Sequence, residues 1–275
     1  MKEHHNEIKE MVKQKYDQIA LQGLPAQPAS CCGSNGEETK VYNIMSEEYT
    51  SLKGYHPEAD LKLGCGLPTE FARIKKGDTV IDLGSGAGND CFVARHETGE
   101  AGKVIGIDFS EEMIRKARIN AYKLRFNNVE FRTGDIEDIP VADQIADVVV
   151  SNCVMNLVPD KAKAFSEVHR ILREGGHFSI SDIVITGDLP AKIKSAAEMY
   201  AGCVASAIYK KDYLEIIEKS GFDNLIIQKK KPIVVPEEIL KNYLSEEEIT
   251  AYNQQDHRIF SITVYAEKPR ATCCG

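Results

Sequence analysis

Short apolar runs typical of buried strands alternate with amphipathic stretches typical of helices through most of the chain. The strand-like runs in its middle part are residues 78–84, 103–108, 129–135, 146–152 and 175–184. Residues 213–222 then predict a helix that leads into a strand at 224–228, and residues 257–269 predict a last strand. This alternation predicts an α/β fold of the Rossmann-like, doubly wound kind. The sheet is expected to be mostly parallel, with an antiparallel last strand because no long helix precedes it.

Two of the helices have clear boundaries in the sequence. Ser110 is placed to cap the helix that follows the second strand. Another helix is expected to begin after Asp160 and to stop at Gly175 and Gly176. Its apolar face would be formed by Phe165, Val168, Ile171 and Leu172.

The first part of the chain differs from the rest. Residues 3–22 have apolar positions at helical spacing and predict an amphipathic helix. Residues 23–39 are rich in Pro, Gly, Ser and Ala without any period, so they predict a loop, and a second helical stretch is expected near Ser46. The predicted organisation is an N-terminal helix and loop, a Rossmann-like core, and a segment of substrate-binding insertions with the last strands. These three parts cover residues 1–45, 46–184 and 185–275, with insertions near 185–210 and 233–256.

Composition narrows the class of protein. A chain of 275 residues with 43% hydrophobic residues can bury one sizeable core. The net charge of -8 provides no basic field for a phosphate backbone, so nucleic acid is not an expected partner. The polar start and the lack of an apolar run of about 20 residues argue against a signal peptide or a membrane span, and we expect a cytoplasmic protein. The oligomeric state is not determined by the sequence.

The turn after the first strand carries the cofactor motif, D-x-G-x-G-x-G. Its acid suits a cationic amino-acid group better than a pyrophosphate, which a G-x-G-x-x-G turn would favour. Asp108 ends the second strand twenty residues after Gly88, where a carboxylate can accept both hydroxyls of a ribose. This set matches S-adenosylmethionine-dependent methyltransferases, and by resemblance to that class Asp135 and Ile136 would hold the adenine. The candidate residues of the turn are Asp82, Gly84, Ser85, Gly86, Gly88 and Asn89.

The chain has eight cysteines, and in a cytoplasmic protein they are expected to be reduced. A buried cysteine can serve simply as a small hydrophobe, which is the expectation for Cys91. No C-x-x-C or H-E-x-x-H spacing indicates a structural zinc site. Cys65 in LGCG, Cys153 in SNCVMNLVPDK and Cys203 in GCVASAIY lie around the cofactor motif instead, which suggests soft-ligand chemistry beside a methyl donor.

These strings, together with DLGSGAGNDC and a double-cysteine loop at Cys31 and Cys32, resemble the arsenite methyltransferases over most of residues 8–210. The string around Cys153 is the most discriminating, since a general member of the fold has no reason to carry cysteine there. Leu63 departs from the family, in which some members have a tyrosine near the cofactor. The C-terminal end is also shorter than in some relatives and ends in a second cysteine pair, Cys273 and Cys274.

The resemblance implies that Cys65, Cys153 and Cys203 bind trivalent arsenic as arsenite or as a thiol conjugate. Three thiolates suit a soft, pyramidal centre and leave its lone pair able to attack the sulfonium methyl. An external thiol of the glutathione or thioredoxin type would act as the reductant. Cys31 and Cys32 either relay arsenic inward or form a dispensable pair, whereas Cys273 and Cys274 either scavenge the metalloid or are part of an ordinary chain end.

Two other functions stay open at this point. A methyltransferase acting on a small organic metabolite, with structural cysteines, would be active without arsenic. A metalloid-binding protein that keeps the fold without turnover would bind arsenite without consuming the cofactor.

Overall fold

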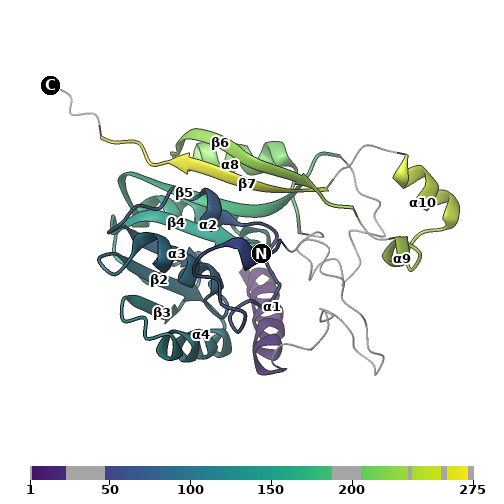
Figure 1. Ribbon diagram of the computed structural model, residues 1–275. Helices are drawn as coiled ribbons and strands as arrows, with labels where there is room; N and C mark the ends of the chain where they lie inside the picture. The colour runs from purple at the N-terminus through teal and green to yellow at the C-terminus, as the bar shows by residue number, and fades with distance from the viewer. Residues whose placement is uncertain (1, 23–46, 188–205, 235–236, 255–258, 272–275) are drawn as a thin grey trace.

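The computed structural model describes residues 2–22, 47–187, 206–234, 237–254 and 259–271. Within them, seven strands form one sheet in the order β3-β2-β1-β4-β5-β7-β6 (Figure 1). The strands are β1 (Thr79–Leu83), β2 (Lys103–Asp108), β3 (Val129–Thr133), β4 (Ala146–Asn152), β5 (Leu172–Ile185), β6 (Asp223–Pro232) and β7 (Ile259–Glu267). The first five run parallel, whereas β7 pairs antiparallel with both β5 and β6. The predicted fold class and its antiparallel last strand are confirmed.

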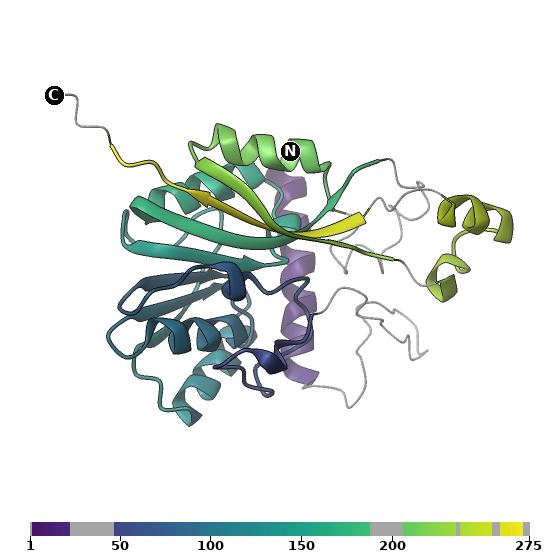
Figure 2. The same ribbon diagram turned by 45° about the horizontal axis from the view of Figure 1, so that its top comes forward.

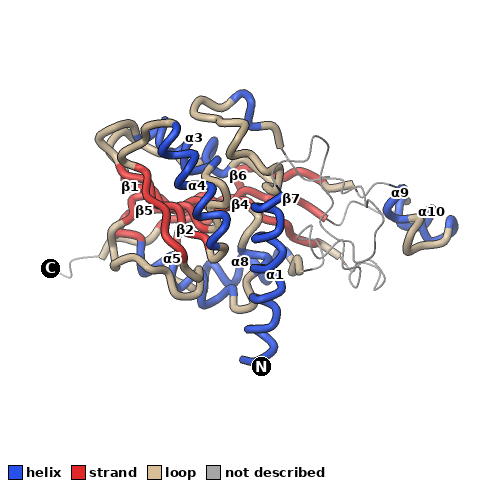
Figure 3. The backbone as a smooth tube through the Cα atoms, turned by 90° about the horizontal axis from the view of Figure 1, so that it is seen from below, coloured by secondary structure: helices blue, strands red, loops and turns tan. Residues whose placement is uncertain are grey.

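Helices cover both faces of this sheet because its central strands are apolar on both sides. Ile81 and Leu83 of β1 belong to a core cluster with α5 (Lys161–Ile171) and α8 (Lys210–Lys219). Val80 belongs to a second cluster with α3 (Asn89–Thr98) and α4 (Glu111–Lys123). Figure 3 shows α3 and α5 on opposite sides of the sheet. The order reverses between β1 and β4, and ligands of doubly wound sheets bind at such a point.

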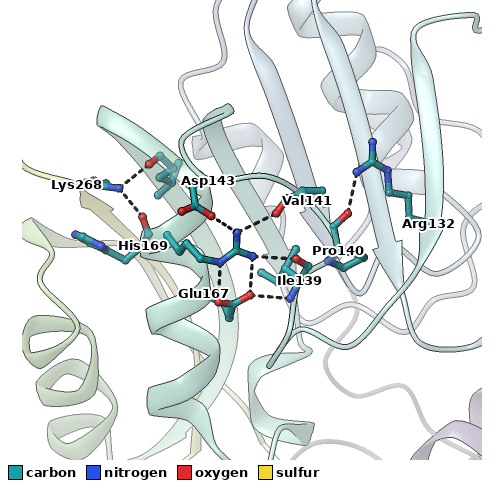
Figure 4. Close-up of polar contacts among 10 residues, drawn as sticks. Arg132, Ile139, Pro140, Val141, Asp143, Glu167, His169 and Lys268 are labelled. Carbon is teal, nitrogen blue, oxygen red and sulfur yellow. Dashed lines mark hydrogen bonds and ion pairs between the residues drawn. The ribbon is translucent and has the colours of Figure 1, made fainter.

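The helix before β5 ends earlier than the sequence indicates. It stops at Ile171, and Leu172 already has extended backbone and pairs with Ala146 of β4. The prediction that the helix continues to Gly175 is wrong. Lys268 explains the boundary, because its ammonium donates to the carbonyls of His169 and Leu172, both at 2.8 Å, and so satisfies the end of the helix (Figure 4).

Arg170 ties the same helix to the segment between β3 and β4. Its guanidinium donates to the carbonyls of Ile139 and Val141, each at 2.9 Å, and pairs with Glu167 and Asp143 (Figure 4). Hydrogen bonds to Glu167 raise the pKa of the arginine above its ordinary value. The network fixes the segment that follows the third strand, on the side of the sheet away from α3.

The N-terminal helix α1 (Lys2–Gln22) forms as predicted and packs beside α4 (Figure 2). Lys9 pairs with Asp135 and Glu137, and Asp17 accepts a hydrogen bond from the hydroxyl of Ser110, the cap of α4. The second expected helical stretch is only the short 3-10 turn η1 (Tyr49–Ser51). Polar contacts from several turns of α1 therefore hold it against the start of α4 and the segment that follows β3.

The remaining short elements surround the parallel strands and the end of β6. They are α2 (Pro68–Phe71), the 3-10 turn η2 (Met155–Leu157), α9 (Glu237–Leu240) and α10 (Glu246–Asn253). Figures 1 and 2 show α9 and α10 beyond the end of β6, away from α3 and α4. Among the helices that the structure describes, none has both the length and the apolar character needed to cross a membrane.

Candidate active site

The glycine-rich turn joins β1 to α3 at the reversal point of the sheet. The amides of Gly84 and Ser85 both donate to the carbonyl of Ile107 in β2, which holds the turn against the neighbouring strand. Gly84 has a positive φ of 73°, and a Cβ there would lie 2.2 Å from the side chain of Val154. Only glycine fits this close approach. The sequence motif therefore has a direct steric cause.

Two polar atoms of this turn have no hydrogen-bond partner among the described residues. They are the hydroxyl oxygen of Ser85 and the amide oxygen of Asn89, and both are buried. Buried polar groups without a partner cost free energy, so such atoms in a concave site point to a ligand that would satisfy them. The turn thus fits a polar cofactor.

Asp108 lies at the carboxyl end of β2 and is buried, with 6% of its surface exposed. One of its oxygens accepts from the amide of Gly86 and the other from the amide of Ser110, each at 2.9 Å. Burial raises the pKa of Asp108 to about 6, while these amide hydrogen bonds act in the opposite direction. The carboxylate, which has about four acceptor positions, keeps capacity to accept from a ligand.

A pocket runs from this turn to the first residues after β4. The lining residues are Tyr16, Tyr49, Ala59, Asp60, Leu61, Leu63, Gly64, Gly84, Ser85, Gly86, Ala87, Asn89, Asp90, Asp108, Phe109, Asn152, Cys153, Val154 and Leu157. Gly88 is not among them, although it caps α3 from a left-handed conformation. The pocket therefore connects the cofactor motif with one of the three cysteines singled out in the sequence.

Asp90 is one of two lining acids that the motif analysis missed, the other being Asp60. Its carboxylate accepts from Tyr49 at 2.7 Å and from Thr69 at 3.1 Å, and the amide of Asn152 is 3.3 Å away. Burial raises the pKa of Asp90 to about 6. It directly follows Asn89 in the sequence, but its role depends on Tyr49 and Asn152, which come from distant segments.

Asp82 has a different environment from the one expected for a group that touches the cofactor. It is 1% exposed, does not line the pocket, and accepts a hydrogen bond from the thiol of Cys91 at 3.2 Å. Burial, followed by the nearby charge of Asp90, raises its pKa well above the ordinary value. Cys91 is fully buried in the core cluster on the α3 side, where a small apolar residue was expected.

Asp135 and Ile136 follow β3 but do not line the pocket. Asp135 is engaged by Lys9 of α1 at 2.6 Å, and Ile136 belongs to the core cluster on the α5 side. Tyr16 and Phe109 line the pocket instead, with ring centroids 6.5 Å apart. An adenine contact by Asp135 or Ile136 stays a prediction.

Cys153 follows β4 in a left-handed conformation, with φ of 62°. This conformation is uncommon for residues other than glycine, and such strain is concentrated at functional sites. Its amide donates to the carbonyl of Ser181 in β5 at 2.8 Å, and only 3% of the residue is exposed. The strained turn holds Cys153 on the pocket wall.

Cys65, in the segment before β1, lies close to Cys153, with the two sulfurs within 4.8 Å of each other. Its amide donates to the side-chain oxygen of Asn152 at 3.0 Å, and its carbonyl accepts from Ser261 of β7. The flanking glycines permit this approach, because a Cβ at Gly64 or Gly66 would come within 2.5 Å of side chains on β4 and β5. The residue is fully buried.

The cysteine ligand atoms converge with a carboxylate that sequence reasoning missed. The sulfurs of Cys65 and Cys153 and a carboxylate oxygen of Asp182 all lie within 4.8 Å of one another. Asp182 is on β5, next to the residue that accepts the Cys153 amide. Cys203, Cys31 and Cys32 lie outside the described residues, as do Cys273 and Cys274. The structure thus brings together two of the three predicted arsenic ligands and adds an acid.

Comparisons with known proteins agree with this geometry. Residues 74–221 match the family model of a methyltransferase domain. An arsenite methyltransferase of Halobacterium salinarum is 38% identical over 96% of the chain and 67% of its own length. The chain belongs to the arsenite methyltransferase family. The human arsenite methyltransferase is 32% identical, and the match covers 78% of this chain but only 58% of the human protein.

A solved structure supports the same assignment. The arsenic(III) S-adenosylmethionine methyltransferase of Chlamydomonas reinhardtii is 32% identical, with a TM-score of 0.64 over 76% of this chain and 68% of that one. The chain is therefore a methyltransferase of the S-adenosylmethionine-dependent class. In its fold, residues of the glycine turn and Cys153 line the same pocket.

Proposed function

We propose that this arsenite methyltransferase transfers a methyl group from S-adenosylmethionine to trivalent arsenic held by the thiolates of Cys65, Cys153 and Cys203. The observation that carries the proposal is the position of Cys153. It lines the pocket that contains Asp108 and the glycine turn, and its sulfur is within 4.8 Å of that of Cys65. A methyl donor and a thiolate-bound acceptor can therefore meet in one pocket.

The pocket residues fit the cofactor. S-adenosylmethionine supplies an electrophilic methyl group on a cationic sulfonium. Asp108 would accept the ribose hydroxyls, and the unpartnered atoms of Ser85 and Asn89 would bind polar groups of the amino-acid part; the hydrogen bond from Gly86 to Asp108 and the two buried, unpartnered atoms support this. Asp90 adds negative charge to the pocket wall, which favours a cation, whereas the charge of Asp60 is balanced by Lys62 at 2.6 Å.

The cysteine side of the pocket fits arsenic. Trivalent arsenic is soft and prefers sulfur, by the argument that applies to soft metal ions. Each thiol that binds arsenic replaces one hydroxyl group of arsenous acid. The thiol proton and the displaced hydroxyl group leave together as one water molecule. Three sulfurs then leave the arsenic lone pair unshared. In-line attack by the lone pair needs no general base, so these residues act mainly by holding the acceptor in position. Such positioning can lower the activation barrier by about 7–11 kcal/mol.

Methylation through the lone pair raises arsenic to the pentavalent state, so an external thiol of the glutathione or thioredoxin type is proposed as reductant. Cys31 and Cys32 are proposed to collect arsenic from a thiol conjugate and pass it to the three-cysteine site. Methylated arsenicals would be the product, and arsenic detoxification the biological role.

The test is to incubate the purified chain with arsenite, glutathione and S-adenosylmethionine, and to separate the arsenic species by liquid chromatography with mass detection. We expect methylated arsenic and one S-adenosylhomocysteine for each methyl group transferred, with neither formed when arsenite is omitted. Cofactor turnover on a small organic acceptor without arsenic would instead favour the metabolite methyltransferase. Arsenite binding without S-adenosylhomocysteine would favour a binding protein.

A further inference from the structure

The cluster formed by Cys65, Cys153 and Asp182 contains one group that a trithiolate arsenic site does not need. Asp182 contributes a hard oxygen ligand, and it is fully buried together with Cys65, while Cys153 is 3% exposed. Burying a carboxylate beside two thiols is costly unless the group has partners or binds a cation. Two hydrogen bonds to Asp182 offset part of this cost, and a cation bound by the three residues would offset more of it.

The carboxylate of Asp182 is held in place as metal-binding carboxylates are. The amide of Ile183 donates to one of its oxygens at 2.9 Å, and the hydroxyl of Tyr213 donates to the other at 3.3 Å. Tyr213 is itself fully buried, and burial raises its pKa well above the ordinary value, so it stays a donor. Such hydrogen bonds orient a ligand and tune its affinity for a metal ion.

We propose that Cys65, Cys153 and Asp182 form a site for a divalent thiophilic cation of the zinc or cadmium class. Zinc binds sulfur at about 2.3 Å and carboxylate oxygen at about 2.0–2.2 Å in a tetrahedral arrangement, so its ligand atoms lie about 3.5–3.8 Å apart. The three ligand atoms of this cluster already lie within 4.8 Å of one another, so small side-chain rotations close the site. Water takes the fourth position, as in other three-ligand zinc sites.

The cation and arsenic would share two ligands and differ in the third. Trivalent arsenic keeps a lone pair and prefers a third sulfur, which Cys203 supplies in the proposed function. A divalent cation without such a lone pair accepts mixed sulfur and oxygen ligands, which Asp182 supplies. Its binding releases the two thiol protons to solvent and requires no redox step. A bound cation would therefore exclude arsenite from the same two thiols.

The test uses the full chain with Cys31, Cys32, Cys273 and Cys274 changed to serine, which removes the two adjacent pairs that could chelate cadmium by themselves. Equilibrium dialysis against Cd²⁺ should give one ion per chain. Asp182→Asn should weaken binding by at least about tenfold, the lower end of what losing a metal-site contact costs. Cys203→Ser should leave the cadmium affinity within about threefold. Cys91→Ser, which removes a buried thiol outside the cluster, is the matched control and should also bind one ion.

A measurement without the Asp182 substitution guards against a variant that fails to fold. Cadmium-edge X-ray absorption of the background chain should show two sulfur and two oxygen neighbours. A shell of three sulfurs, unchanged binding in Asp182→Asn, or no retained cadmium would each overturn the proposal. Circular dichroism of each variant verifies that it is folded.

The arsenite measurements separate this inference from the proposed function. Cys203→Ser should lose arsenite binding and Asp182→Asn should keep it, which is the reverse of the cadmium result. The arsenite-binding results for these variants rest on the proposed function, and so does the competition of Cd²⁺ with arsenite, and not with S-adenosylmethionine, in the methylation assay. If arsenic is not methylated at all, the cadmium stoichiometry and the ligand shell still decide whether the cation site exists.

Discussion

The two ends of the active-site pocket are built in different ways. The glycine-turn end uses neighbouring residues of the turn and of the start of α3, 84–87 and 89–90, together with Asp108 on the adjacent strand, and backbone amides fix its geometry. At the other end the pocket wall contains Cys153, and Cys65 and Asp182, which do not line the pocket, bring their ligand atoms within 4.8 Å of its sulfur. These three residues come from distant segments, and contacts with side chains help to fix their geometry. Changes at one end should therefore leave the other largely intact, and the following predictions test that separation.

The largest effect is expected from Cys153→Ser. Serine has nearly the same size but is a much harder ligand, so arsenite methylation should fall by about 100-fold or more, equivalent to about 2.7 kcal/mol of barrier. The affinity for S-adenosylmethionine should stay within about threefold, because the glycine-turn end does not depend on a sulfur. Steady-state rates and calorimetric titration measure the two quantities. Full activity, or arsenic-edge X-ray absorption with fewer than three sulfurs in the unmodified protein, would defeat the trithiolate mechanism.

Asp108→Ala should have the opposite selectivity. It removes hydrogen bonds to a charged acceptor, each worth about 1.5–3 kcal/mol, so the dissociation constant of S-adenosylmethionine should rise by at least about tenfold. Arsenite affinity should hardly change. Asp212→Ala, which removes an exposed carboxylate on α8, is the matched control. Unchanged cofactor binding in the Asp108 variant would remove that residue from the site.

The affinity for S-adenosylmethionine should also depend on pH, through two buried acids of the pocket. Burial raises the pKa of Asp90 and of Asp108 to about 6, and a cationic cofactor favours their ionised forms. Affinity should therefore be full above pH 7 and fall by up to about tenfold per unit for each group as the pH drops below 6. Titrations from pH 5 to 8 with the wild type and Asp108→Asn measure this. An equally steep profile in the variant would assign the titration to another group.

The smallest effect is expected from Cys65→Ser with a trivalent monomethyl arsenical as substrate. This substrate has only two exchangeable valences, so it should tolerate the loss of one thiol, and the rate should stay within about threefold of wild type. Arsenite methylation by the same variant should still fall sharply, because arsenite has three exchangeable valences and only two of the three proposed thiols remain to fill them. Parallel assays with the two substrates decide the matter. Equal loss on both would show that Cys65 is not the spare thiol.

Sequence reasoning was most successful where structure follows from neighbouring residues. The strand Ala146–Asn152 has the predicted bounds, and Ser110 caps its helix as expected, with its hydroxyl oxygen accepting from the amide of Met113. It failed at the end of α5, where Lys268 from the far end of the chain satisfies the helix carbonyls. It also missed Asp90 as a lining residue, because the position of Asp90 depends on Tyr49 and Asn152.

The sequence by itself determined the parallel sheet and the glycine turn and singled out Cys153 as a candidate, because strand periodicity, turn sterics and an unusual cysteine are local properties. Only the tertiary structure decided which groups meet. Strand β4 lies between β1 and β5, so the turn after it comes beside both the cofactor motif and Asp182. Strand order depends on how the whole sheet packs, and no local pattern around Asp182 records that two thiols lie next to it.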